Sequence, residues 1–374
     1  MRTTWPHWPQ AVEHTPPRTI DMHAPSTPLK LARRQTINVT ADSMVRARPL
    51  FEDGALPLVV EPELAGVDAP AWIERHGDAL AGWLPRHGAI LFRGFGIADE
   101  AAFHRAVAAT GVRLMSYIEK ATPREHLGRH IYTSTYFPQE YAIALHNELS
   151  YVKAWPGRIF FCCTAPAATG GATPLADVRR VLGRIDPAVR DEFHRRGWQL
   201  ARCFGSGMGP SWRHAYAVES VDELERYLRA MDVSWQWLPN GWLRTRQVRP
   251  AIHTHPRTGD ALWFNHVAFW HASSLHEPVR RRFEADFGVE SLPYNTYYGD
   301  GGTIPDDVAA HLRDAYARET VAFPWRKGDF LIADNMLIAH GRAPFTGERR
   351  VLAAMGDAVE LDAREMAALR ERLA

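Results

Sequence analysis

Short apolar segments separated by turn-rich sequence are the feature that most limits how this chain can fold. Each segment has the length of a strand, and no glycine-rich phosphate loop marks a strand-to-helix junction. Numerous short strands of this kind favour a barrel or a sandwich over a parallel βαβ sheet. The predicted strands lie within residues 88–95, 158–165, 198–204, 242–248, 261–267 and 329–340.

Helical periodicity alternates with these strands, so helices are expected to pack around them. Residues 1–45 are rich in Pro, Thr, Ser and His and have no sustained periodicity, which predicts a mobile N-terminal extension. Residues 46–374 are predicted to form a single domain, because β-barrel enzymes often reach this length as one unit. The predicted helices are residues 99–111, 186–197, 220–231 and 304–319.

Charge, hydropathy and cysteine use argue against several classes of protein. A net charge of +1 provides no field that would attract nucleic acid or an anionic membrane surface. No apolar run is long enough to predict a transmembrane helix, and the first residues lack the apolar core of a secretory signal. Cys162, Cys163 and Cys203 favour a reducing compartment, so a cytoplasmic location without disulfides is expected.

Two His-x-Asp/Glu triplets occur, and about two are expected by chance from the 18 His and 43 acidic residues, so their context has to separate them. His76 and Asp78 lie in an amphipathic stretch predicted to be helical, where a solvated face explains both. His146 and Glu148 lie in an aromatic, alternating segment. On a strand, residues i and i+2 point to the same side, so both could reach one ion. The alternative is a core histidine beside an unrelated glutamate.

A third candidate ligand, His340, stands at the end of the last predicted strand. Two imidazoles and one carboxylate on one face of an octahedral ion leave three positions open, as in non-haem Fe(II) oxygenases. Arg349 and Arg350 follow shortly, and a guanidinium binds the carboxylate of a cosubstrate bidentately. These residues therefore predict an oxygenase that uses Fe(II), O2 and a carboxylate-bearing cosubstrate such as 2-oxoglutarate. A zinc hydrolase is disfavoured because no His-Glu-x-x-His helix is present.

Several phrases, in a fixed order, resemble the taurine dioxygenase/clavaminate synthase-like superfamily of Fe(II)/2-oxoglutarate oxygenases. The resemblance runs from about residue 50 to residue 357 and is closest to the amino-acid β-hydroxylase-like members of natural-product pathways. It implies a mostly β fold, a double-stranded β-helix or jelly roll with outer helices, and an insert between the metal-ligand motifs. The phrases are GAILFRGF (88–95), YIEKATPR (117–124), YTSTYFP (132–138), LHNELSY (145–151), GGATPLADVR (170–179), LPYNTYYGDG (292–301), FPWRKGDFLIADNMLIAHGR (323–342) and PFTGERRVLAAM (344–355).

The resemblance also implies a role for each candidate. His146, Glu148 and His340 would bind Fe(II), while 2-oxoglutarate and O2 would occupy the remaining positions. The distal carboxylate of 2-oxoglutarate would meet an Arg soon after the second His and a Thr after the first. Thr173 fits the second role. For the first role Arg350 is preferred and Arg349 is the alternative, because on an alternating strand only one of them can point inward.

The substrate is predicted from departures within the resemblance. Glu148 stands where halogenases of the wider group carry a small residue, and Ala354 stands where taurine dioxygenase has a second Arg, so neither halogenation nor a sulfonate substrate is expected. The predicted reaction is hydroxylation of a small molecule, an amino acid or its derivative, either free or presented on a carrier protein. The alternatives are desaturation, cyclisation, or a jelly-roll protein that binds without catalysis. Candidate substrate contacts are Tyr132, Thr133, Ser134, Asn265 and His266.

Overall fold

The computed structural model describes residues 44–374, except 53, 116–125, 129–130, 134–136 and 206–208. The predicted N-terminal extension therefore lies almost wholly outside the described residues. Strand β1 begins at Val45, the last residue of the predicted extension. The division into an extension and one domain stays a prediction.

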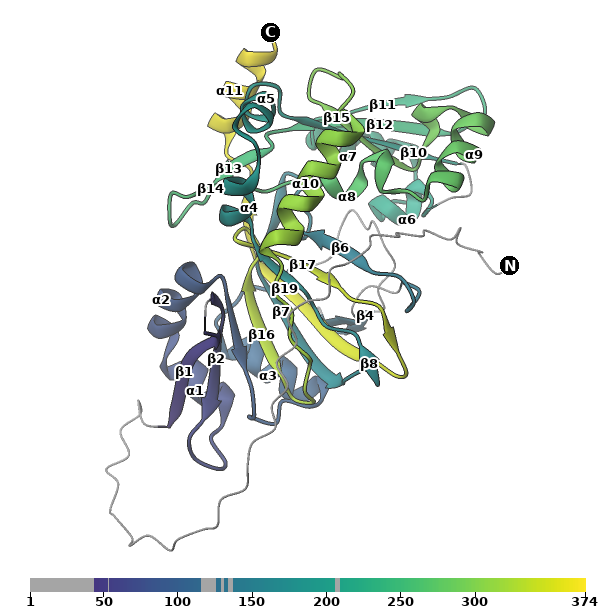
Figure 1. The fold of residues 1–374 in the computed structure, drawn as a ribbon. Helices are drawn as coiled ribbons and strands as arrows, with labels where there is room; N and C mark the ends of the chain where they lie inside the picture. The colour runs from purple at the N-terminus through teal and green to yellow at the C-terminus, as the bar shows by residue number, and fades with distance from the viewer. Residues whose placement is uncertain (1–43, 53, 116–125, 129–130, 134–136, 206–208) are drawn as a thin grey trace, which may run out of the picture.

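An eight-stranded sheet is the largest sheet in the described part of the chain and lies in the lower half of the molecule in Figure 1. Its central strand β7 is apolar on both faces, as expected for a strand that is covered on both sides. Ile159, Phe161 and Cys163 belong to the main core, whereas Phe160 and Cys162 face a second core formed with the N-terminal helices. In sheet order the strands are β1 (Val45–Phe51), β2 (Gly54–Pro62), β3 (Ala89–Phe92), β16 (Phe330–Asp334), β7 (Ala154–Ala165), β19 (Arg350–Glu360), β5 (Ile131–Thr133) and β4 (His126–Gly128).

The outer face of this sheet is covered by α1 (Ala69–Arg75), α2 (Gly77–His87) and α3 (Glu100–Ala109). Asp68 and Asp99 cap α1 and α3 through side-chain oxygens that accept backbone N–H groups of the first turn. His76 lies at the junction of α1 and α2, where its ring stacks on Trp72 at 4.3 Å between centroids. The helical environment predicted for the His76/Asp78 triplet is confirmed.

A three-stranded sheet lies against the inner face of the larger one. Its strands, in order, are β6 (Ile143–His146), β17 (Ile338–Arg342) and β9 (Leu175–Asp177). The two sheets meet where the ring of Phe161 on β7 lies 5.1 Å from the ring of His340 on β17. The main core fills the space between them, and the residues of β17 are all buried, whereas those of β6 are partly buried.

The segment between β9 and β16 builds the other half of the molecule, at the top of Figure 1. It contains a four-stranded sheet in the order β11-β12-β10-β15, the β13–β14 hairpin and several helices. The strands are β10 (Trp198–Phe204), β11 (Val233–Trp237), β12 (Leu243–Arg249), β13 (Ile252–Thr254), β14 (Ala261–Trp263) and β15 (Tyr294–Tyr298). The helices are α4 (Val178–Arg184), α5 (Pro187–Arg196), α6 (Trp212–Tyr216), α7 (Val221–Ala230), α8 (Val267–Trp270), α9 (Glu277–Phe287) and α10 (Asp306–Glu319), with 3-10 turns η2 (Ala272–Ser274) and η3 (Val289–Ser291).

Helix α11 (Ala363–Leu373) ends the chain, and β8 (Thr169–Gly170) pairs with β18 (Phe345–Thr346) beside the smaller sheet. All four predicted helices are present, as α3, α5, α7 and α10. The strand predicted over 261–267 is wrong beyond Trp263, because Asn265 Oδ1 accepts the N–H of Val267 and starts α8 instead. Eleven α-helices in the described part of the chain, most of them between β9 and β16, give a mixture of helix and strand, so the expected mostly β fold is found only in part.

None of the helices in the described part of the chain is long and apolar enough to cross a membrane.

Candidate metal centre

The two candidate histidines lie directly opposite each other on neighbouring strands. β17 pairs antiparallel with β6, and His340 is the register partner of His146. Directly opposed residues carry their side chains on one face within about 5.5 Å of each other. Their rings accordingly lie 4.6 Å apart between centroids, on the side of the smaller sheet that faces β7.

Glu148 joins the pair from a turn rather than from the strand. β6 ends at His146, and Leu149 has a φ of 57°, in the left-handed region that a bulky residue adopts only under constraint. The sequence-based expectation that both residues lie on one strand is therefore wrong for Glu148. The turn still brings its carboxylate oxygen Oε2 to 3.9 Å from Nε2 of His340.

The three side chains form the one group of potential metal ligands found among the described residues, with all candidate ligand atoms within 4.8 Å of one another. Glu148 and His340 are buried, and His146 is partly buried. Two imidazoles and a carboxylate at this spacing suit Fe(II) with open positions for further ligands.

The protein also orients the first imidazole. Nδ1 of His146 lies 2.9 Å from the carbonyl oxygen of Ala144, so Nδ1 carries the proton and donates it. Nε2 is then the nitrogen whose lone pair would be available to a metal ion. This arrangement sets the tautomer that coordination requires.

His266 stands immediately behind His146, with ring centroids 5.6 Å apart. Its Nδ1 lies 2.6 Å from the Ser150 hydroxyl, and its ring packs on Trp270 at 4.4 Å. Burial first, and the neighbouring His146 second, hold the pKa of His266 well below its usual 6.5, so this ring is neutral. Phe269, 5.0 Å from the His146 ring, completes an aromatic wall.

The preference for Arg350 as the inward arginine is wrong in its facing. Val351, Ala353 and Met355 point into the main core, whereas Leu352 and Ala354 point toward α1 and α3. The pairing of β19 with β7 is irregular between Arg350 and Val351, and it is the ion pair with Glu100 at the start of α3 that places Arg350 on the helix side.

Arg349 points inward instead. Its Nε donates to the carbonyl of Gly171 at 2.8 Å, and its Nη2 lies 3.4 Å from the Thr173 hydroxyl. Thr173 is buried two residues before β9, and its hydroxyl also accepts the indole N–H of Trp325 at 3.0 Å. Thr173 therefore lies beside an inward-pointing arginine, which is Arg349 and not the preferred Arg350. Contact of these two side chains with 2-oxoglutarate stays a prediction.

A second cation lies next to this pair. Arg342, on β17 two residues after His340, is buried and donates to the carbonyls of Phe137, Pro138 and Tyr141. Burial lowers the pKa of Arg342 to about 10, and burial followed by repulsion from Arg342 lowers the pKa of Arg349 to about 10. Both remain charged at neutral pH, and two neighbouring partly desolvated cations favour an anionic ligand.

The predicted substrate contacts are only partly described. Tyr132 is buried in the main core opposite Ala353, and the backbone of Thr133 pairs with Leu352. The Thr133 side chain and the whole of Ser134 lie outside the described residues. Asn265 donates to the carbonyl of Ala251 and accepts from Val267, so its contacts there are structural. A role in substrate binding stays a prediction for all of them and for His266.

Sequence reasoning assigned no role to Asn335, Trp325, Arg342, Ser150 or Phe269. Asn335, Trp325 and Arg342 stand in the same phrase as His340, but their partners are distant in sequence. Cys162 and Cys163 are buried free thiols, and burial raises their pKa values to about 12 and about 11. Thiols with such pKa values are protonated and unreactive at neutral pH.

Fold and site together define a class. Residues 48–355 match the model of the family described as "Taurine catabolism dioxygenase TauD, TfdA family", and the chain belongs to this family. Membership confirms the resemblance found in the sequence and the class it implied, a dioxygenase that depends on iron and 2-oxoglutarate. A binding protein without catalysis is thereby set aside.

Two proteins with similar sequences and two solved structures with a similar fold can be compared with this chain. The chain is 39% identical over 282 residues to the dapdiamide synthesis protein DdaC of Enterobacter agglomerans, covering 75% of this chain and 86% of that protein. It is 26% identical over 323 residues to a clavaminate synthase-like protein of Arabidopsis thaliana, covering 82% and 94%. A crystal structure of PvcB from Pseudomonas aeruginosa has the same fold, with a TM-score of 0.51 at 19% identity over 86% of this chain and 95% of that chain. A second PvcB structure, described as an Fe, α-ketoglutarate-dependent oxygenase from an isonitrile synthetic pathway, gives 0.51 at 18% identity over 88% and 98%.

Proposed function

We propose that this enzyme hydroxylates an unactivated C–H bond of an amino acid or amino-acid derivative in a biosynthetic pathway. The observation that carries the proposal is the convergence of His146, Glu148 and His340 beside two partly desolvated arginines. Support for the pathway comes from the relatives, one named for dapdiamide synthesis and one for an isonitrile synthetic pathway.

The residues present fit both cofactor and cosubstrate. His146, Glu148 and His340 would hold Fe(II) on one face, and Arg349 with Thr173 would hold the distal carboxylate of 2-oxoglutarate. When bound, iron and 2-oxoglutarate supply the oxidative decarboxylation that yields succinate and CO2 and transfers an oxygen atom to the substrate. The chain's task is to orient these groups and to exclude water.

The chain's own residues divide that task. The Ala144 carbonyl keeps the proton of His146 on Nδ1, and the neutral ring of His266 adds no charge beside the ligand. Arg342 adds positive charge next to Arg349, which favours the dianionic cosubstrate over neutral molecules. Phe269 and the buried face of β7 surround these polar groups with apolar side chains.

The proposed jelly roll consists of the eight-stranded sheet as one wall and the β6–β17–β9 sheet as the other. The metal centre would then lie at the interior face of the smaller wall, at the end of β6 and on β17. The segment between β9 and β16 would be the insert, and its α8 places His266 and Phe269 behind the metal ligand His146.

A substrate screen tests the proposed outcome. Free and carrier-protein-bound amino acids, incubated with enzyme, Fe(II), 2-oxoglutarate and O2, should give a product heavier by one oxygen atom, with one succinate formed per product. Loss of two hydrogen atoms would instead show desaturation or cyclisation by the same cofactor chemistry. Product found only with carrier-bound amino acids would identify presentation on a carrier, and products that contain chlorine or release sulfite would contradict the proposal.

A further inference from the structure

We infer that the dipeptide Asp334–Asn335 is a positioning unit for both halves of the metal centre, and that His255 from the β13–β14 connection orients it. The inference rests on the proposed metal ligands and deepens that proposal. Neither residue offers an atom to the metal group itself. They act through Glu148 and His340.

The side chain of Asn335 forms hydrogen bonds with the turn that carries Glu148. Its side-chain oxygen accepts the N–H of Glu148 at 2.8 Å, and its amide nitrogen donates to the carbonyl of Glu148 at 2.9 Å and to that of Pro156 at 2.8 Å. Asn335 is completely buried, so no water competes for these bonds. Both backbone groups of Glu148 are therefore held by one side chain.

The backbone of Asn335 also forms hydrogen bonds near this turn. Its carbonyl accepts the side-chain amide of Asn147 at 2.7 Å, and its N–H donates to the carbonyl of Gly157 at 2.9 Å. Because Leu149 is left-handed, the chain leaves the direction of β6 directly after Glu148. The hydrogen bonds from Asn335 to the N–H and the carbonyl of Glu148 hold this residue in place, so that its carboxylate stays close to the two histidines where the chain turns away.

Asp334 performs the matching task for the second histidine. It ends β16, and its Oδ1 accepts the N–H groups of Met336 and Leu337 at 3.0 and 3.2 Å. This tight turn leads directly into β17, which starts at Ile338 and carries His340. The geometry of the turn therefore sets where β17 begins relative to β16.

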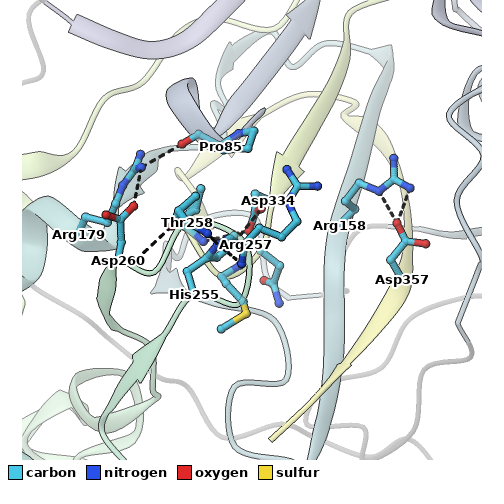
Figure 2. A network of polar contacts seen from close by, with 12 residues as sticks. Pro85, Arg158, Arg179, His255, Arg257, Thr258, Asp260, Asp334 and Asp357 are labelled. Atoms are coloured by element: carbon cyan, nitrogen blue, oxygen red, sulfur yellow. Dashed lines mark hydrogen bonds and ion pairs between the residues drawn. The ribbon is translucent and has the colours of Figure 1, made fainter. Parts of the chain in front are cut away.

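His255 orients Asp334 from outside the site, as Figure 2 shows. Its Nδ1 accepts the N–H groups of Arg257 and Thr258, so the proton is on Nε2, which donates to Oδ2 of Asp334 at 3.2 Å. Each carboxylate oxygen of Asp334 thus has a separate partner: one holds the turn and the other is held by His255. Through this contact the segment between β9 and β16 contributes to the metal centre without supplying a ligand.

The connection that carries His255 is itself anchored. Asp260 donates its N–H to the Thr258 hydroxyl, and its carboxylate pairs with Arg179, which also donates to the carbonyl of Pro85 in α2 (Figure 2). The same loop is therefore fixed to α2 and to the start of α4. A fixed loop is what allows His255 to hold Asp334 in one orientation.

Cobalt(II) titration, followed by visible absorption without cosubstrate, tests the inference. Asn335→Ala should weaken Co(II) binding about ten- to a hundredfold, the usual effect of removing a partner that orients a metal ligand. His255→Phe, which keeps a ring in the space, should weaken binding by a smaller factor because it acts through Asp334. Unfolding temperatures of all variants are measured in parallel.

Matched controls separate positioning from general destabilisation. Asn295→Ala removes another buried amide that bonds to backbone N–H groups, and His253→Phe removes a buried histidine that pairs with Glu365 instead of Asp334. Both should bind Co(II) like wild type even where they unfold earlier. Wild-type affinity in Asn335→Ala, or equal weakening in the controls, would overturn the inference. If His146→Ala bound Co(II) like wild type, the proposed ligands themselves would be wrong.

Discussion

Alanine at His146, Glu148 or His340 is expected to abolish Fe(II)-dependent formation of succinate from 2-oxoglutarate. The candidate ligand atoms of the three side chains all lie within 4.8 Å of one another. Any two of the side chains alone would bind Fe(II) weakly, because the three ligands on one face of the ion are needed together. Anaerobic Fe(II) binding and succinate formation are the two measurements. Both should be lost in each variant.

His76→Ala provides the control for these variants. His76 belongs to the other His-x-acid triplet of the chain, lies between α1 and α2 with its ring stacked on Trp72, and is not a member of the metal group. This variant should retain Fe(II) binding and turnover. A ligand variant that kept near-native activity would remove that residue from the proposed set.

Arg349→Ala should raise the KM for 2-oxoglutarate roughly ten- to a hundredfold, because a hydrogen bond to a charged carboxylate contributes about 1.5–3 kcal/mol. Arg349→Lys should recover part of the affinity, since lysine restores the charge but not the planar fork. Initial rates over a range of 2-oxoglutarate concentrations give the measurement.

Arg350→Ala is the adjacent control. Its side chain is 42% exposed and pairs with a Glu100 that is equally exposed, an ion pair of the kind that contributes about 0–1 kcal/mol to stability. Its KM for 2-oxoglutarate should stay within about twofold of wild type, since no charge-assisted bond to the cosubstrate is lost. A larger increase for Arg350→Ala than for Arg349→Ala would show that the facing of β19 differs from the one described above.

The sequence was sufficient to predict which three side chains come together, because His340 and the family-like phrases add to what the segment around His146 and Glu148 alone leaves open. Their binding of iron stays a prediction. The sequence was not sufficient to choose between Arg349 and Arg350. Alternation says only that they face opposite ways, and the choice depends on which of Val351 and Leu352 enters the main core, a tertiary property. The turn at Glu148 was missed because its support comes from Asn335, 187 residues later in the chain.

The error over residues 261–267 has a local cause. A short apolar run has no periodicity that distinguishes a strand from a buried helix. Here the side chain of Asn265 accepts the N–H of Val267 at the start of α8 and also donates to the carbonyl of Ala251. That change of direction brings His266 and Phe269 beside His146, where a continued strand would have carried them away.

A crystal structure of the enzyme with manganese(II), a redox-stable substitute for Fe(II), and 2-oxoglutarate tests the central claim most directly. The anomalous signal of the metal should lie within bonding distance of His146 Nε2, the Glu148 carboxylate and a ring nitrogen of His340. The distal carboxylate of 2-oxoglutarate should contact Arg349 and Thr173. A metal bound elsewhere, such as at the His253–Glu365 pair, or a cosubstrate held by Arg350, would contradict the account.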